Sequence, residues 1–336
     1  MSVIFVESFD HFTSTNNSFS KWTGTNSSVI NTAPVRRAGS SYLNNIQTGT
    51  GNGVIRTLGS NYGTLCCGTG IRHPYSDAHT GIIFRDAGTA QITFRLTTTG
   101  AVEVFRGLTT TGTRIGLSGP AVTPDNQWVY MECKARIANA GEYEVRIDGS
   151  VVLVSGTGLA DTANTANEYA NELYLVGYAN YDDLYLTDGT FLGDCRVDCL
   201  FPTASGTYTQ HTPLSGFNWD NVNDASPDQG TTYNSSGVSG TIDTFYFTPL
   251  PGVSGSIYAV QWNACIARDA PGVIYGQPIY MPDSVPGNYY IDPSKYQAFD
   301  AYTTYSDIWE SPLSNPGGPW LSGQITSGQF GIRTLL

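Results

Sequence analysis

Charged residues are scarce in this chain of 336 residues, and basic residues are the scarcest. Only 13% of the residues are charged, and 28 acidic residues against 16 basic ones give a formal net charge of −12. Typical soluble domains carry about 25% charged residues. A chain this acidic lacks the basic surface that nucleic acids and anionic membranes require. The composition therefore argues against both as partners.

Long apolar runs are also missing. Met1–Phe12 alternates like a strand and does not place a charged segment before an apolar one, so we expect neither a signal peptide nor a membrane helix. The six cysteines of a chain without a secretion signal do not predict a disulfide framework. We expect the protein to be made and folded in a cytoplasm.

Residues that favour sheets and tight turns are abundant. The chain contains 21 Tyr, 38 Gly and 17 Pro, and no long stretch shows a helical hydrophobic period. Aromatic and β-branched residues suit half-buried strands, whereas Gly and Pro mark the turns between them. The composition predicts an all-β protein.

Strand signals recur through residues 1–201. The candidate strands are Val3–Phe9, Gly81–Asp86, Gln91–Thr97, Ala101–Arg106, Trp128–Ile137, Glu142–Asp148, Ser150–Val154, Leu173–Tyr178, Asp183–Thr187 and Asp194–Phe201. Asp148-Gly149 favours a primed two-residue turn and predicts a hairpin. In that hairpin Tyr143, Val145 and Ile147 share the inward face. We expect an antiparallel jelly-roll sandwich over residues 1–201.

The composition changes after Phe201. Residues 202–240 are rich in Thr, Ser, Asn and Pro and predict a connector that lies on a surface. Strand signals return at Thr244–Phe247 and Ile257–Ala267, and weaker ones follow as far as Leu335. We expect residues 241–336 to form a second, smaller β-sandwich domain.

The hypothesis that the protein is a glycosidase requires two carboxylates that flank the scissile bond. In retaining enzymes these two carboxyl groups are about 5 Å apart. Glu142 and Glu144 have a suitable spacing, but Arg146 continues the same face as a solvated strand exterior would. Asp182 and Asp183 are adjacent, so on a strand they point to opposite faces. We predict no catalytic residues and no enzyme activity.

Two metal hypotheses can be written from the sequence. The zinc candidates are Cys66, Cys67, His73 and His79, because cysteine sulfur and imidazole are ligands that zinc prefers. Their spacing, however, matches no compact zinc site. Calcium prefers carboxylates on loops, and the candidates are Asp182, Asp183 and Asp188. Structural roles explain both sets more simply, so we predict no metal site and no cofactor.

The remaining cysteines fall mainly in predicted strands. Cys133 lies on the apolar face of Trp128–Ile137 and is expected in the core. Cys195 and Cys199 are four residues apart, roughly 13 Å along a strand, so they cannot bond to each other there. Both are expected to be core residues, with a bond to another cysteine or to a neighbouring subunit as the alternative. The sequence assigns neither a redox state nor a pairing to any of the six cysteines, Cys265 included.

Several segments together resemble a known family. They are VESFDHF (Val6–Phe12), YEVRIDGSVV (Tyr143–Val152), YDDLYLTDG (Tyr181–Gly189), the link FNWDNVNDASPDQGTTYN (Phe217–Asn234) and the closing QFGIRTLL (Gln329–Leu336). In this order they resemble tailed-bacteriophage minor structural proteins that carry a concanavalin A-like, or laminin G-like, jelly-roll domain. The resemblance implies a virion protein but transfers no catalytic residue.

The function expected from this resemblance is a non-enzymatic structural component of a phage virion, in the capsid, neck, collar or tail. Its partners would be other virion proteins and further copies of the chain, with a trimer as one option. The alternative is a carbohydrate-binding protein that recognises a receptor from the virion. Its glycan patch would consist of aromatic rings, and the candidates are Tyr174, Tyr178, Tyr181 and Tyr185.

Overall fold

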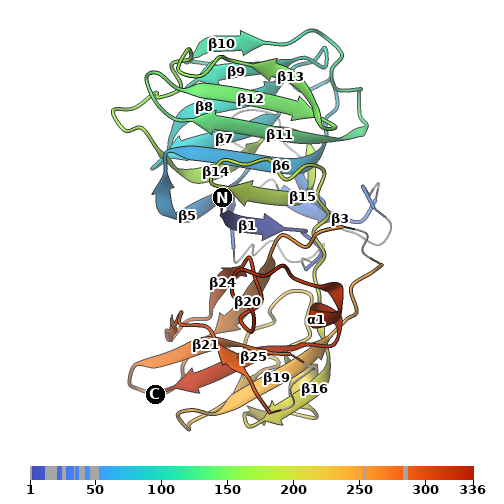
Figure 1. The fold of residues 1–336 in the computed structure, drawn as a ribbon, viewed down its shortest axis with the longest axis vertical. Coiled ribbons are helices and arrows are strands. Elements are labelled where there is room, and N and C mark those ends of the chain that lie inside the picture. The colour runs from blue at the N-terminus through green and yellow to red at the C-terminus, as the bar shows by residue number, and fades with distance from the viewer. Residues whose placement is uncertain are drawn as a thin grey trace. The chain divides into compact units, whose positions relative to one another are not determined.

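A computed structural model describes residues 2–11, 21–24, 28–33, 35–37, 42–45, 53–252, 255–282 and 287–336 of the chain. Met1 and Phe12, the ends of the predicted opening strand, lie outside these residues. The chain divides into two compact units, Met1–Val197 and Asp198–Leu336. Both are built almost entirely of strands (Figure 1). Among the described residues, no helix combines the length and apolarity needed to cross a membrane.

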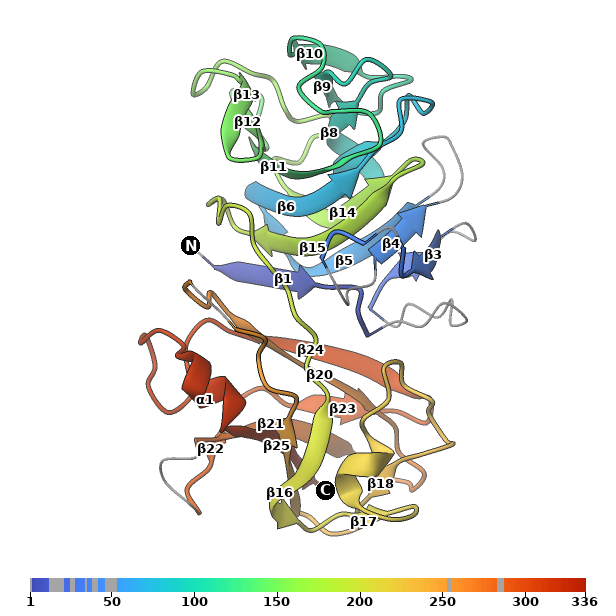
Figure 2. The same cartoon turned by 90° about the vertical axis from the view of Figure 1, so that its right-hand side faces the viewer.

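The first unit is a sandwich of two antiparallel sheets (Figure 2). Sheet A runs in the order β13-β12-β11-β6-β15-β4-β3, and β1 also pairs with β15. Its strands are β1 Val3–Glu7, β3 Ser28–Asn31, β4 Tyr42–Asn45, β6 Thr64–Arg72, β11 Trp128–Arg136, β12 Glu142–Ile147, β13 Ser150–Val154 and β15 Asn180–Thr187. Sheet B runs in the order β10-β9-β8-β7-β14-β5-β2. Its strands are β2 Thr23–Gly24, β5 Gly53–Tyr62, β7 Gly81–Asp86, β8 Thr89–Leu96, β9 Val102–Arg106, β10 Thr113–Leu117 and β14 Ala170–Val176.

The core of the first unit lies between the two sheets and is mainly aliphatic. On β11, Val129, Met131 and Cys133 alternate into this core as the sequence predicts. A fully buried aliphatic side chain contributes about 1.5–3 kcal/mol. Alternate residues of a strand point to opposite faces, so the face that carries the apolar residues is the one that the sandwich buries.

The predicted hairpin is confirmed in detail. Asp148 and Gly149 have φ angles of +48° and +78°, the left-handed values that a type I′ turn requires at both positions. Ile147 and Ser150 close the turn as register partners. The inward face also matches, because Tyr143, Val145 and Ile147 are buried.

The predicted strand Asp194–Phe201 is wrong. Residues 188–201 form no strand, and residues 188–197 (the crossing segment) run over the outer face of sheet A. Their N–H groups bind side chains instead of a neighbouring strand: Gly193 donates to Glu132 (2.9 Å) and Val197 to Asp183 Oδ1 (2.8 Å). Cys195, Val197 and Cys199 alternate with charged residues as they would in a strand, but Cys195 packs on the outer face of the sheet beside Phe191 and Leu192.

The second unit has a six-stranded antiparallel sheet in the order β16-β19-β25-β21-β22, with β23 also paired to β21. These strands are β16 Pro202–Thr209, β19 Ile242–Phe247, β21 Ile274–Met281, β22 Tyr290–Ile291, β23 Tyr296–Ala298 and β25 Gln329–Leu335. Two further pairs are β17 Thr212–Pro213 with β18 Asn234–Ser235, and β20 Val260–Ile266 with β24 Thr303–Trp309. The helical elements are the 3-10 turn η1 Asn218–Asn221 and the helix α1 Ser322–Thr326.

Aromatic rings fill the core of the second unit. Trp262 and Trp309, from β20 and β24, pack with Tyr280 and Phe330 of the six-stranded sheet. The Trp309 and Phe330 ring centroids are 6.1 Å apart, and the Trp309 Nε1–H donates to Asp292 (2.8 Å). Two β layers therefore enclose this core, and the predicted class, a jelly-roll sandwich followed by a smaller β-sandwich, is confirmed.

Residues 202–240, expected as a connector, are part of the second unit. β16 pairs with β19, and the rest of the segment is tied to the buried carboxylate of Asp243. This carboxylate accepts the His211 N–H (2.9 Å) and the side-chain amides of Asn218 (2.7 Å) and Asn234 (3.2 Å). Side-chain hydrogen bonds therefore replace the strand alternation that the sequence lacks here.

Candidate binding site

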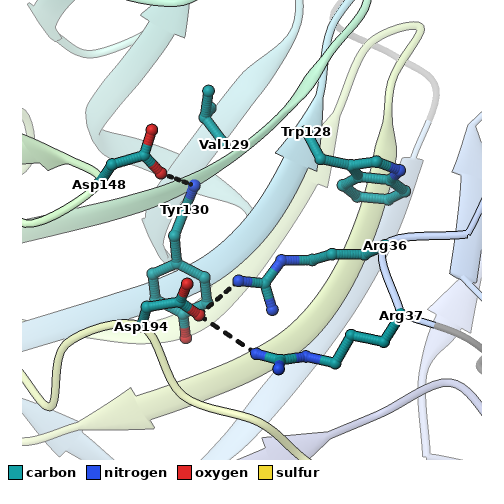
Figure 3. A pocket seen from close by; sticks show the side chains of 7 residues that line it. All are labelled: Arg36, Arg37, Trp128, Val129, Tyr130, Asp148 and Asp194. Atoms are coloured by element: carbon teal, nitrogen blue, oxygen red, sulfur yellow. Dashed lines mark hydrogen bonds and ion pairs between the residues drawn. The ribbon is translucent and has the colours of Figure 1, made fainter.

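A pocket of about 280 Å³ lies on the outer face of sheet A in the first unit. Its lining comes from β11, from the turn after β12, from the crossing segment and from residues before β4. The lining residues are Arg36, Arg37, Trp128, Val129, Tyr130, Asp148 and Asp194. Figure 3 shows both arginines extending into the pocket toward Asp194 and the Tyr130 ring.

Two carboxylates hold the arginines in place. Arg36 forms ion pairs with Asp183 and Asp194. Arg37 pairs with the same two residues, with its Nε 2.7 Å from Asp183 Oδ2 and its Nη2 3.3 Å from Asp194 Oδ1. Both guanidinium groups also donate to the carbonyl of Cys195. The pocket wall is therefore a network of guanidinium and carboxylate groups with little net charge.

Arg36 also lies over the ring of Tyr130, with its guanidinium carbon 4.9 Å from the ring centroid. Burial lowers the pKa of Arg36, but the charges of Asp183 and Asp194 outweigh this and raise it. The guanidinium is therefore a permanent cation that the ring and the carboxylates hold rigidly.

A β-bulge places the carboxylate that binds both arginines. The pairing of β15 with β6 shifts register between Asp182 and Tyr185, and Asp183 has a φ of +50°. Burial, and then the charge of Asp183, raise the pKa of Asp182 to about 8, while Arg36 lowers it. The adjacent aspartates were predicted to lie on opposite faces because of strand alternation, but the bulge interrupts that alternation at Asp183, so the regular period of two does not apply to this pair.

The rim of the pocket carries an indole and an exposed carboxylate. The Trp128 ring packs edge-on against Tyr42, with centroids 5.6 Å apart, and stays half-buried. Asp148 is exposed, and its Oδ1 accepts the Tyr130 N–H (2.8 Å). The site thus combines an aromatic surface with fixed hydrogen-bond donors and acceptors.

The crossing segment supplies Asp194 and is itself anchored on a buried acid. Glu132 accepts hydrogen bonds from the Tyr185 hydroxyl and from the Gly193 N–H. Burial, followed by the neighbouring Cys66 and Glu132, raises the pKa of Tyr185 far above its ordinary range, so its hydroxyl remains a donor. This anchor fixes the backbone that positions Asp194.

The sequence reasoning missed this site. The sequence predicts Trp128 only as the start of a strand and Asp148 only as a turn residue. The only available signal was Arg36-Arg37, two adjacent arginines in a chain with 16 basic residues. No local sequence pattern predicts that these arginines lie beside β11. Their position depends on the order of strands in sheet A, β11-β6-β15-β4, which is set by pairing between distant segments.

The other candidate carboxylates, Glu142 and Glu144, lie on the outer face of β12. Glu144 Oε1 binds Arg146 Nε (2.7 Å), and Arg146 covers the ring of Phe191 at 4.1 Å. Glu142 is half-buried on the same outer face of β12. These residues therefore belong to the outer face of sheet A, which the crossing segment partly covers.

The structure disperses the predicted tyrosine patch. Tyr181 is in the core, where its hydroxyl donates to the carbonyls of Val176 (2.7 Å) and Gly81 (3.0 Å). Tyr174 lies under Arg85 in sheet B, and Tyr185 lies under the crossing segment. Tyr178 remains exposed. Alternate residues of β14 and β15 thus face different layers.

The metal candidates do not converge in the structure. Cys66 faces the crossing segment, whereas Cys67 lies in the core between the sheets. His73 Nε2 contacts the carbonyl of Thr97 (3.1 Å). Asp188 accepts the Ser2 N–H (2.6 Å). Within the described ranges, no three His, Cys, Asp or Glu side chains group as a metal site would require.

The prediction of a core position is confirmed for Cys133 and is wrong for Cys195 and Cys199. Cys133 is fully buried, and its register partner across β6 is Cys67. Cys195 and Cys199 are half-buried and lie in no strand, because residues 188–201 bind side chains instead of a sheet. None of the six cysteines forms a disulfide bond in this structure.

No family model matches the sequence. No curated protein matches it either. Solved structures that are similar include the cellulose induced protein Cip1 (13% identity, 53% of this chain and 92% of that chain, TM-score 0.37) and alginate lyase Aly36B (13%, 58% and 98%, 0.37). Carbohydrate-binding module CBM66 from Bacillus subtilis is another (10%, 49% and 93%, 0.33).

These comparisons correct the expected function. The similar structures named here are a cellulose induced protein, an alginate lyase and a carbohydrate-binding module, and none of them is a virion protein. The prediction of a structural role in a phage virion is therefore withdrawn. The resemblance to phage proteins in sequence, and the localisation that it implied, stay predictions.

Proposed function

We propose that the first unit is a non-enzymatic glycan-binding module and that its binding site is the pocket around Trp128. The observation that carries this proposal is the pairing of a half-buried indole with fixed guanidinium and carboxylate groups in one pocket. A sugar ring offers a C–H face for an aromatic ring and hydroxyls for polar groups at its edge. Both kinds of partner are present at this site.

The charge balance of the pocket favours a neutral glycan. The two guanidiniums are neutralised by Asp183 and Asp194, and Asp148 adds a further carboxylate at the rim. An anionic sugar would meet these carboxylates without a free cation to compensate them. Neutral hydroxyls, by contrast, can donate hydrogen bonds to the carboxylates and accept them from the Arg36 guanidinium.

The contacts of the pocket carboxylates support binding without cleavage. Asp194 is held by two arginines, and Asp148 is engaged by the backbone of Tyr130. A general acid or nucleophile must change protonation or form a bond during catalysis. Groups that already hold the fold together are poor candidates for those roles.

The test is a screen of immobilised neutral and acidic glycans, followed by calorimetry on any ligand found. We expect Trp128→Ala to weaken binding by about 30-fold, the loss of about 2 kcal/mol that a central aromatic contact provides. Phe217→Ala is the matched control, because Phe217 is an exposed ring in the other unit.

Two results would refute the proposal. One is the absence of binding to any glycan by a folded protein. The other is binding that Trp128→Ala and Phe217→Ala leave equally strong, which would place the site elsewhere. Release of shorter saccharides during incubation would refute the non-enzymatic part alone.

A further inference from the structure

Two glycines leave open positions on the outer face of sheet A. Both lie on the central strand β6, where Cys67 and Ile71 point into the core between the sheets. Because side chains alternate along a strand, Gly68 and Gly70 lie on the opposite, outer face. Glycine inside a strand weakens it and often marks a place where another group approaches closely. The contacts of the two glycines show which groups approach.

Side chains from elsewhere in the chain fill both positions. A Cβ atom on Gly68 would lie 2.6 Å from Cζ of the Tyr185 ring, and one on Gly70 would lie 2.7 Å from Nε of Arg36. Both separations are shorter than ordinary van der Waals contact, about 3.5 Å. Tyr185 is the register partner of Gly68 on β15. Arg36, by contrast, belongs to neither of the strands that pair with β6.

The open position at Gly70 adjoins the pocket. The register partner of Gly70 on β11 is Tyr130, and Tyr130 and Arg36 both line the pocket. The Arg36 side chain passes over Gly70 and places its guanidinium carbon 4.9 Å from the centroid of the Tyr130 ring (Figure 3). Arg36 therefore occupies the space that a side chain at position 70 would need.

The contacts of Arg36 leave it little freedom to move aside. Its guanidinium forms ion pairs with Asp183 and Asp194 and donates to the carbonyl of Cys195. Only 10% of its side chain is exposed. A methyl group added at Gly70 would push the middle of the side chain outward, so the guanidinium would have to give up some of these partners.

We propose that Gly70 is a positioning residue of the pocket. The missing side chain at position 70 lets Arg36 lie against sheet A and thereby fixes the guanidinium that a ligand meets. Even the smallest side chain at this position should displace Arg36 without changing the charge of the pocket. The effect on a glycan rests on the proposed function, whereas the positioning of Arg36 does not.

The first test is a double-mutant cycle on the thermal unfolding of the full chain, measured by calorimetry without ligand. Gly70→Ala should lower the unfolding temperature of the first unit by about 5 °C, as expected for an overpacked site. In an Arg36→Ala background the same change should cause no further loss, because the space is then vacant.

Gly59→Ala is the matched control for both tests. Gly59 also lies within a strand of the first unit, β5, and no atom of the described residues lies within 4 Å of a Cβ added to it. Glycine inside a strand is less favourable than alanine when space is available. Gly59→Ala should therefore lower neither the unfolding temperature nor the affinity for a ligand.

The second test repeats the cycle with the glycan that the screen finds to bind most tightly. Gly70→Ala should weaken binding by about 10-fold, the loss expected for one hydrogen bond to a charged group. Once Arg36 is alanine, Gly70→Ala should have little further effect on affinity. This pattern would show that Gly70 acts on the ligand through Arg36.

Two outcomes would overturn the proposal. One is a loss of stability from Gly70→Ala that is equally large with and without the Arg36 side chain. The other is glycan binding that Gly70→Ala leaves unchanged. If Gly70→Ala alone fails to fold, recovery of folding in the double variant supports the proposal, and failure of both variants overturns it. Absence of glycan binding by the wild type, with the thermal coupling present, would refute the proposed function and leave the positioning of Arg36 by Gly70 in place.

Discussion

The two units bury their strands with different kinds of side chain. The first unit packs two large sheets around aliphatic residues, and its polar groups lie mainly on the outer faces. The second unit packs fewer strands around Trp, Tyr and Phe, and three of its indole N–H groups have buried hydrogen-bond partners. A small sheet has little area to bury, so larger rings and internal polar contacts stabilise it.

The buried carboxylates differ in the same way. In the first unit Glu132 and Asp183 hold a segment and two arginines against the outside of a finished sandwich. In the second unit Asp243 organises residues 211–234, which have few strand contacts of their own. We therefore expect the loss of Asp243 to affect its whole unit, whereas the buried acids of the first unit should have local effects.

The largest expected effect is that of Asp243→Ala. Removing this carboxylate leaves a backbone N–H and two amide donors without their acceptor, which should lower the free energy of unfolding by about 4 kcal/mol. Urea unfolding followed by tryptophan fluorescence measures this, because Trp219, Trp262, Trp309 and Trp320 belong to the second unit.

Asp300→Ala provides the control for that measurement. The Asp300 side chain is 85% exposed and pairs with Arg268, so its loss should cost less than about 0.5 kcal/mol. Equal losses from the two variants would show that the Asp243 network does not hold the second unit together.

A smaller effect is expected from pH acting on the first unit. Burial raises the pKa of Asp182 to about 8 from an ordinary value of 3.8, so the folded state keeps a proton that the unfolded chain loses. The resulting stability is fully present below pH 3.8 and is lost as pH rises through about 8.

Asp182→Asn should remove this pH dependence. The wild type should become less stable between pH 5 and pH 8 relative to the variant, as measured by thermal unfolding monitored by circular dichroism. An exposed control, Asp300→Asn, should follow the wild type. If the stability of Asp182→Asn and of the wild type changes with pH in the same way over this range, the pKa of Asp182 is not raised in the folded protein.

The smallest effect concerns the rates of thiol labelling. Cys66, Cys67 and Cys133 are fully buried, and burial raises the pKa of Cys66 and Cys133 far above the ordinary range. The thiolate is the reactive form, so these three should resist N-ethylmaleimide in the folded state. Cys195, Cys199 and Cys265 are half-buried and should react first.

Mass spectrometry of peptides after timed labelling measures these rates. Urea-unfolded protein is the control and should be labelled at all six cysteines. Rapid labelling of Cys133 in the folded chain would mean that the sandwich opens readily, contrary to the packing of its core.

The sequence predicted the strands better than the site. Runs such as Trp128–Ile137 and the hairpin around Asp148-Gly149 were correct because alternation and turn chemistry act between near neighbours. The strand predicted at Asp194–Phe201 was wrong because Cys195, Val197 and Cys199 alternate with charged residues although the segment lies across a sheet and is not part of one. Residues 211–240 show no strand pattern in the sequence. Part of this segment is held by hydrogen bonds from Asn218 and Asn234 to Asp243, and local alternation does not predict such contacts.

By itself the sequence determined the all-β class, the inward face of each regular strand and the acidic, weakly charged surface. These follow from composition and from the period of two, which are local properties of the chain. Only the tertiary structure decided that Arg36 and Trp128 share a pocket and that β13 ends a sheet. Both depend on the order in which strands pair, and that order is set by contacts between residues far apart in the chain.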